Sequence, residues 1–166
     1  MRVYIPVTLA MLQRLVADQS MHALSGTAFA VTPTLRESYA EGDDDELAEV
    51  ALHEAAMASL RLLAAEDQTT GLPLRRAVLV AEVDGAKARP DLDDAVVRLA
   101  GPIGVADVIA AYVDNAAAEP AVAAAVEVVD LADLGDEDAE LTVGDAQDHD
   151  LAWYATQELP FLLELL

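Results

Sequence analysis

Short apolar segments that stop at a proline or a glycine limit the folds open to this chain. The segment over residues 2–7 is rich in β-branched and aromatic side chains and includes Pro6, a composition that predicts a short strand. Leu9 and Leu12 follow at helical spacing, so an amphipathic helix is expected over residues 9–18. The chain therefore begins with a strand and a helix in direct succession.

The same order of apolar strand, break and helix start recurs along the chain. It begins at Val3, Phe29, Val96 and Trp153. One interpretation is a weak internal repeat of two halves that meet near residues 67–73. The other is that any protein built from strands and helices shows such an order, and the sequence leaves both open.

Periodicity and turn residues predict the remaining elements. Strands are expected over residues 27–32, 76–83, 95–99 and 151–155. The acidic run 41–46 precedes the longest expected helix, residues 45–66, because acidic side chains favour the first turn of a helix. Helices are also expected over residues 105–113, where Val105, Val108, Ile109 and Tyr112 share a face, and from Pro120 onward.

These elements predict one α+β domain over residues 1–166, with about five strands and about four helices. The turn dipeptide Asp84-Gly85 places two strands next to each other in sequence, which argues against a doubly wound parallel sheet. We therefore expect a mixed or antiparallel sheet, with the helices packed on one side.

Charge is distributed unevenly along the chain. The net charge is −22, and all nine Lys and Arg residues lie at or before Arg98. Residues 99–166 contain 15 acidic residues, of which nine lie in residues 130–150, an expected acidic loop. Such a charge argues against direct binding to nucleic acid or to an anionic membrane, because both need clustered Lys and Arg.

Two functions are compatible with this charge pattern, besides a simple role in solubility. The first is a non-enzymatic interaction protein that binds a basic protein partner, in place of nucleic acid, through its acidic C-terminal half. The candidate partner-binding residues are Asp133, Asp136, Glu137, Asp138 and Glu140. The alternative is a small enzyme or ligand-binding protein with an anion pocket. Its candidate residues are Arg2, Arg36, Arg75 and Arg76.

No motif for catalysis, a metal or a cofactor is complete. The chain has no Cys, and His53-Glu54 is followed by Met57 where a zinc-protease helix needs its second His. Neither a Gly-x-Ser-x-Gly turn nor a phosphate-binding glycine pattern occurs. The sequence therefore predicts no catalytic residue, no metal site and no cofactor.

The two ends of the chain bear on location and assembly. Arg14 interrupts the first apolar stretch early, and no apolar run reaches the length of a membrane span, so a cytoplasmic protein is expected. Residues 159–166 are strongly apolar. They are expected either to complete the core or to form an interface with another subunit, which leaves a homodimer open.

Four stretches resemble those of an uncharacterised family of small acidic proteins from high-GC actinobacteria. They are MRVYIP, TAFAVTPTLRESYAEGD, RPDLDDAVVRLAGP and DHDLAWYATQELPFLLEL. The resemblance covers essentially the whole chain and implies a cytoplasmic bacterial protein. It implies no activity, cofactor or catalytic residue.

Overall fold

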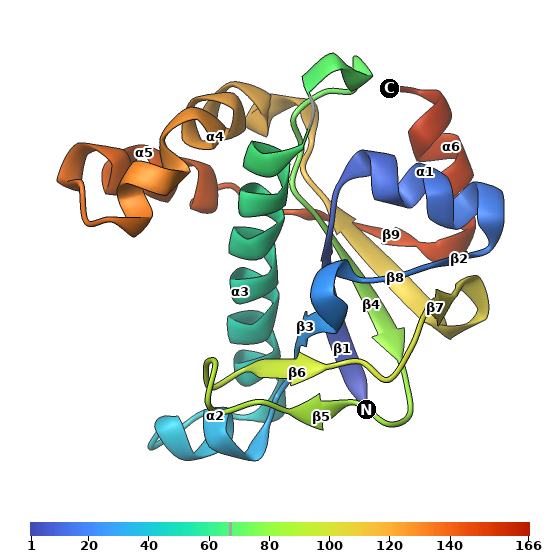
Figure 1. Cartoon of the computed structure of the whole chain (residues 1–166), viewed down its shortest axis with the longest axis vertical. Coiled ribbons are helices and arrows are strands. Elements are labelled where there is room, and N and C mark those ends of the chain that lie inside the picture. The colour runs from blue at the N-terminus through green and yellow to red at the C-terminus, as the bar shows by residue number, and fades with distance from the viewer. Residues whose placement is uncertain (67) are drawn as a thin grey trace.

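Two antiparallel sheets and six α-helices make up the part of the chain that the computed structural model describes, residues 1–66 and 68–166 (Figure 1). The strands are β1 (Arg2–Val7), β2 (Ser20–Met21), β3 (Thr27–Phe29), β4 (Ala77–Glu82), β5 (Lys87–Ala88), β6 (Val96–Arg98), β7 (Ile103–Gly104), β8 (Val108–Val113) and β9 (Ala152–Ala155). The helices are α1 (Leu9–Asp18), α2 (Pro33–Ser38), α3 (Asp44–Ala65), α4 (Glu119–Asp133), α5 (Glu137–Gln147) and α6 (Leu159–Glu164). The 3₁₀ turns are η1 (Leu24–Gly26), η2 (Gln68–Thr70), η3 (Val105–Asp107), η4 (Ala116–Ala118) and η5 (Thr156–Glu158).

The large sheet has seven strands in the order β5-β6-β3-β1-β4-β8-β9, and the small sheet pairs β2 with β7. Every pair of neighbours runs antiparallel. The expected single α+β domain with an antiparallel sheet is thus confirmed. The strand number exceeds the expected five because of four further strands. Three of them, β2, β5 and β7, have only two residues each, too few to leave a pattern in the sequence, and the fourth is β8.

Helices cover both faces of the large sheet, which corrects the expectation that they pack on one side. Val3, Ile5 and Val7 of β1 belong to one apolar core, which they share with α1 and α6. Tyr4, between them, belongs to a second core with α3 on the opposite face. Because both faces are covered, the central strands are apolar at successive positions and show no alternation that would reveal a solvent-exposed face.

The same double coverage explains why the helix expected over residues 105–113 is wrong. This segment forms η3 and then the strand β8, which lies between β4 and β9. A strand buried on both faces is a continuous apolar run, and periodicity alone does not distinguish it from a buried helix. The β-branched side chains of Val105, Val108, Ile109 and Val113 are the signal that favoured a strand.

The acidic segment 130–150, expected to be a loop, contains the end of α4 and all of α5. Strands from both sides of the expected break at residues 67–73 lie in one sheet, with β3 and β1 between β6 and β4. Residue 67 of that break lies outside the described residues.

The C-terminal segment divides between core and surface. Leu159 and Leu162 are 1% and 8% exposed and pack in the core that contains α1. Trp153 and Phe161 are 57% and 68% exposed. The segment therefore closes one core and also presents large apolar side chains to solvent.

Candidate functional site

Helices α4 and α5 form a hairpin that projects from the body of the protein beside the C-terminal half of α3 (Figure 1). Residues 134–136 connect the two helices. Gly135 has a φ of +94°, in the left-handed region that glycine adopts at little cost. Asp136 caps α5, since its Oδ1 accepts a hydrogen bond from the Ala139 N–H at 2.9 Å. The turn thus ends one helix and starts the next.

Small side chains hold the hairpin together. Its buried residues are all Ala or Val, and they pack against Leu60 and Leu63 of α3. Short side chains let helices lie close to one another. The hairpin therefore shares a core with the longest helix of the protein.

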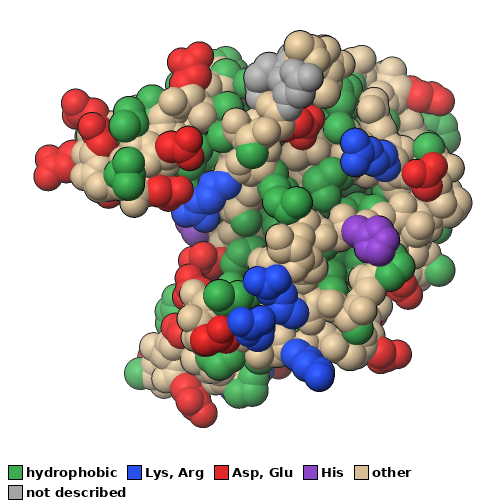
Figure 2. Space-filling model, viewed as in Figure 1, with side chains coloured by type: hydrophobic (Ala, Val, Ile, Leu, Met, Phe, Trp, Pro, Cys, Tyr) green, Lys and Arg blue, Asp and Glu red, His purple; other side chains and the backbone are tan. Residues whose placement is uncertain are grey.

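Nine acidic residues and no basic residue lie in residues 119–147, the span of the two helices and their turn. Figure 2 shows red acidic side chains at the outer end of the projection. Because no basic side chain of the hairpin compensates these charges, they add up to a strong negative potential around it.

The five acidic residues predicted to bind a partner all lie near the hairpin turn, but two of them are engaged within the protein. Asp133 accepts two hydrogen bonds of 3.0 Å from Arg61 on α3. These bonds lower the pKa of the Asp133 carboxyl below its ordinary value. Asp136 is the cap described above. Glu137, Asp138 and Glu140 are exposed in the first turn of α5, where a negative charge faces the positive end of the helix dipole.

Three leucines on the hairpin are exposed, which the sequence reasoning missed. Leu131, Leu134 and Leu141 are 50%, 85% and 70% exposed, and Figure 2 shows green side chains between the red ones on the projection. The sequence held a signal for Leu131. At about 100° per residue it lies on the side of α4 opposite Val129, which belongs to the buried stripe.

A buried ion pair lies where the hairpin joins the sheet. Arg76, just before β4, donates from Nε and from one terminal nitrogen to the two oxygens of Asp114, just after β8, at 2.9 and 2.8 Å. The side chains are 1% and 0% exposed. The other terminal nitrogen donates to Gln147 Oε1 at 2.7 Å, and the carbonyl of His149 also accepts a bond from Arg76. Arg76 therefore links the end of α5 to two central strands.

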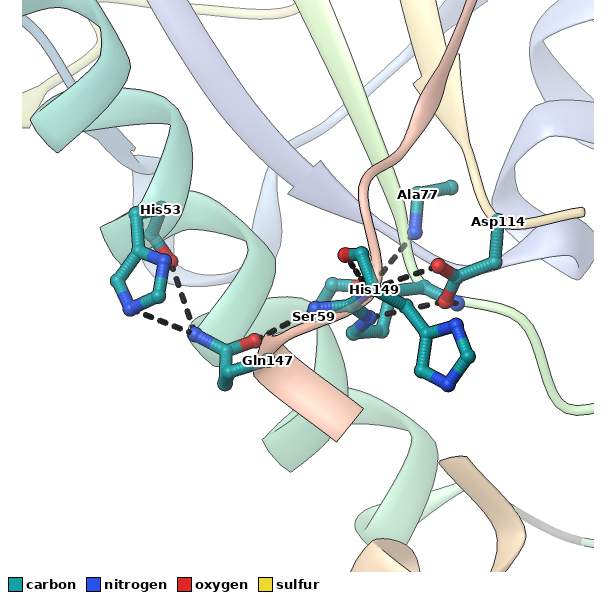
Figure 3. Close-up of polar contacts among 7 residues, drawn as sticks. His53, Ser59, Ala77, Asp114, Gln147 and His149 are labelled. Atoms are coloured by element: carbon teal, nitrogen blue, oxygen red, sulfur yellow. Dashed lines mark hydrogen bonds and ion pairs between the residues drawn. The ribbon is translucent and has the colours of Figure 1, made fainter. Parts of the chain in front are cut away.

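Gln147 continues this network to α3, as Figure 3 shows. Its Nε2 lies 3.2 Å from His53 Nε2 and 3.4 Å from the His53 carbonyl oxygen. Arg76 can only donate, so the amide oxygen of Gln147 faces Arg76 and its NH2 faces His53. The NH2 group of Gln147 therefore donates toward α3, where the ring nitrogen and the carbonyl oxygen of His53 both lie within reach.

Ser59 of α3 forms a second polar link, which joins this helix to the sheet. Its hydroxyl donates to the Val7 carbonyl at 2.7 Å and accepts from the Ala77 N–H at 3.0 Å. Ser59 is fully buried, so both bonds stand in for bonds to water. Together with Gln147, it fixes α3 against the ends of the central strands β1 and β4.

The four arginines of the predicted anion pocket lie apart and each faces a carboxylate. Arg2 and Arg76 are at opposite ends of the paired strands β1 and β4. Arg2 pairs with Glu82, Arg36 with Asp44, Arg75 with Glu119 and Arg76 with Asp114. Only Arg75 and Arg76 are neighbours, and Arg76 is directed into the buried network.

Two further observations limit the chemistry of the described residues. No group of three or more His, Asp or Glu side chains within residues 1–66 and 68–166 is placed to hold a metal ion. Among the same residues, no helix is both long enough and apolar enough to cross a lipid bilayer.

The fold and the hairpin define an α+β protein with a large antiparallel sheet, helices on both faces and an acidic helical projection. A model of the family of unknown function DUF6912 matches residues 1–163. The chain belongs to this family, which confirms the expected membership of an uncharacterised family. No curated protein and no solved structure matches the chain.

Proposed function

We propose that the protein is a non-enzymatic interaction protein whose α4–α5 hairpin binds a basic protein partner. One observation carries the proposal: a hairpin with nine acidic and no basic side chains also exposes Leu131, Leu134 and Leu141. The acidic charge attracts a cationic partner over a distance, and it speeds association. The leucines supply apolar area that contact with the partner removes from water.

The way the hairpin is held supports this function. Asp133, Gln147 and the shared apolar core fasten it to α3 and to the sheet. A binding element that is rigid before contact loses little conformational freedom on binding. The hairpin therefore presents Glu137, Asp138 and Glu140 on a fixed frame.

The partner's chemistry follows from the surface it must match. It carries Lys and Arg residues around an apolar patch or pocket, and its association weakens as salt screens the charges. A second copy of this chain fits less well, because it brings another net charge of −22. The anion-pocket alternative has less support, since Arg2, Arg36, Arg75 and Arg76 each face a carboxylate. We place the interaction in the cytoplasm of a high-GC actinobacterium, as the family resemblance implies.

Photo-crosslinking in cells that naturally make the protein tests the proposal. A photoreactive amino acid replaces Leu134 on the hairpin or, as the control, Leu92 between β5 and β6, which is 49% exposed. We expect the Leu134 probe to capture a protein rich in Lys and Arg that the Leu92 probe does not capture. Identical captured proteins at both positions, or capture of acidic proteins only, would contradict the proposal.

A further inference from the structure

A groove of about 710 Å³ lies between α1, the segment from β2 to η1, and the C-terminal end of α3, away from the hairpin. Figure 2 shows green side chains in a hollow between α1 and α3, with blue and purple side chains at its rim. Met11, Arg14 and Asp18 follow one another along the α1 wall, because residues three and four apart share a helix face. A volume of this size is within the range of small-molecule sites.

The floor and walls of the groove are apolar. Met21 is buried, Met11 and Leu62 are partly buried, and Leu24 is 62% exposed. Methionine side chains are flexible and polarisable, so they adapt to aliphatic groups of different shapes. The apolar part of a ligand bound in the groove would cover side chains that are otherwise in contact with water.

The rim of the groove carries both positive and negative groups. Arg14 and His22 provide N–H donors, and Asp18 and Glu66 are also part of the lining. Within residues 1–66 and 68–166, Arg14 has no carboxylate at ion-pair distance. Its guanidinium is therefore available to a ligand carboxylate, whose geometry it matches.

The groove wall that contains His22 and Leu24 lies between two residues whose backbone is in the left-handed conformation. Gln19 has a φ of 63° and Ser25 a φ of 56°, and they are the two non-glycine residues with positive φ among the described residues. Gln19 ends α1, and its N–H bonds to the Leu15 carbonyl at 2.8 Å. Such conformations cost energy and occur often at ligand sites.

We infer that this groove binds a small amphipathic monocarboxylate. The aliphatic part lies on Met11, Met21 and Leu62, and the carboxylate accepts hydrogen bonds from Arg14 and His22. Asp18 and Glu66 on the same rim, together with the overall negative charge, oppose a doubly charged group such as a phosphate ester. The site is distinct from the predicted anion pocket, because Arg14 is not one of its four arginines.

Titration of the full chain with decanoate, followed through the methionine methyl signals by NMR, tests the inference. The signals of Met11 and Met21 should shift, while that of Met57, which packs near α4, should not. Arg14→Gln should weaken decanoate binding roughly ten-fold or more, the loss expected for a charged hydrogen bond. Lys87→Gln, at an exposed cation outside the groove, should leave the affinity unchanged.

Decylamine and decanol separate the contribution of charge from that of the aliphatic chain. Both should bind more weakly than decanoate, because neither offers a carboxylate to the Arg14 guanidinium. The inference is overturned by equal binding of decylamine and decanoate, by unchanged decanoate affinity in Arg14→Gln, or by no shift of Met11 and Met21 at millimolar decanoate.

Discussion

Arg76 and Asp114 form an ion pair that is completely enclosed by protein, with their side chains 1% and 0% exposed and their closest nitrogen and oxygen atoms 2.8 Å apart. The pair joins the start of β4 to the end of β8, and the Arg76 backbone N–H also donates to Asp114 at 2.8 Å. Burying a charge is costly, and here the attraction between the two charges offsets that cost. If one member is removed, the charge of the other stays buried without compensation.

Removing one member of this pair should therefore cost more than removing both. Arg76→Met should lower the free energy of unfolding by about 3–5 kcal/mol, since it leaves the Asp114 charge buried and unpaired. Adding Asp114→Leu should recover a large part of that loss. Urea denaturation of both variants measures this, with Arg36→Met, at an exposed pair, as a control that should cost about 1 kcal/mol or less. A double variant less stable than Arg76→Met would contradict the account.

Gln147 should determine how firmly the end of α5 is held. Gln147→Ala removes the acceptor for Arg76 and the contact with His53, so amide hydrogens in α5 should exchange faster while those in β4 and β8 stay protected. Gln13→Ala, at an exposed position of α1, provides the control. Unchanged exchange in α5 would show that the apolar core alone holds the hairpin.

Replacement by alanine should have a large effect on stability at one position of the C-terminal helix and a small effect at another. Leu159→Ala should cost about 2–5 kcal/mol, because Leu159 is 1% exposed in the main core. Phe161→Ala should change stability by about 0.5 kcal/mol or less, since Phe161 is 68% exposed. Thermal or urea unfolding measures both. Deletion of residues 151–166 should leave an unfolded or insoluble chain, because β9 and the core residues of α6 are lost with it.

The pair between Arg61 and Asp133 should contribute to stability in a pH-dependent way. The Arg61 hydrogen bonds lower the pKa of Asp133 in the folded state from its ordinary value of 3.8. Its contribution, about 0.2–1 kcal/mol for a surface pair, is therefore complete above that value and is lost as the pH falls through the lower folded-state pKa. Asp133→Asn should be less stable than the wild type at neutral pH, and the difference should disappear in acid as Asp133 becomes protonated in the folded state. A difference that persists in acid would contradict this cause.

Local patterns were enough to predict the elements whose ends are marked by caps, prolines or acidic turns. The strand β1 and the helices α1 and α3 lie within about a residue of their expected bounds, since Thr8 and Asp43 cap the helices with side-chain hydrogen bonds. The strand β8 was missed because burial on both faces removes the alternation that reveals a strand. The helix α5 was missed because its acidic composition resembles that of a solvated loop.

The candidate site was predictable only as a charge pattern. The five acidic residues stand close together in the sequence, and they remain together on the hairpin. The exposure of Leu131 follows from its spacing to Val129 on α4, but the exposure of Leu134 and Leu141 depends on how the turn and α5 pack against α3, which is a tertiary property. Arg76 was predicted only as part of an anion pocket, and its buried network was missed because its partners Asp114 and Gln147 are 38 and 71 positions away.

Affinity capture at two salt concentrations tests the role of the hairpin most directly. The variant Glu137→Gln, Asp138→Asn, Glu140→Gln removes three exposed charges and keeps Asp133 and Asp136, which are engaged within the protein. Its control is Glu37→Gln, Glu41→Gln, Glu49→Gln, which changes the net charge equally at exposed positions in and between α2 and α3. At low salt the wild type and the control should capture the same basic protein and the hairpin variant should not, and high salt should release it from both. Capture of the same proteins by all three at both salt concentrations would contradict the account.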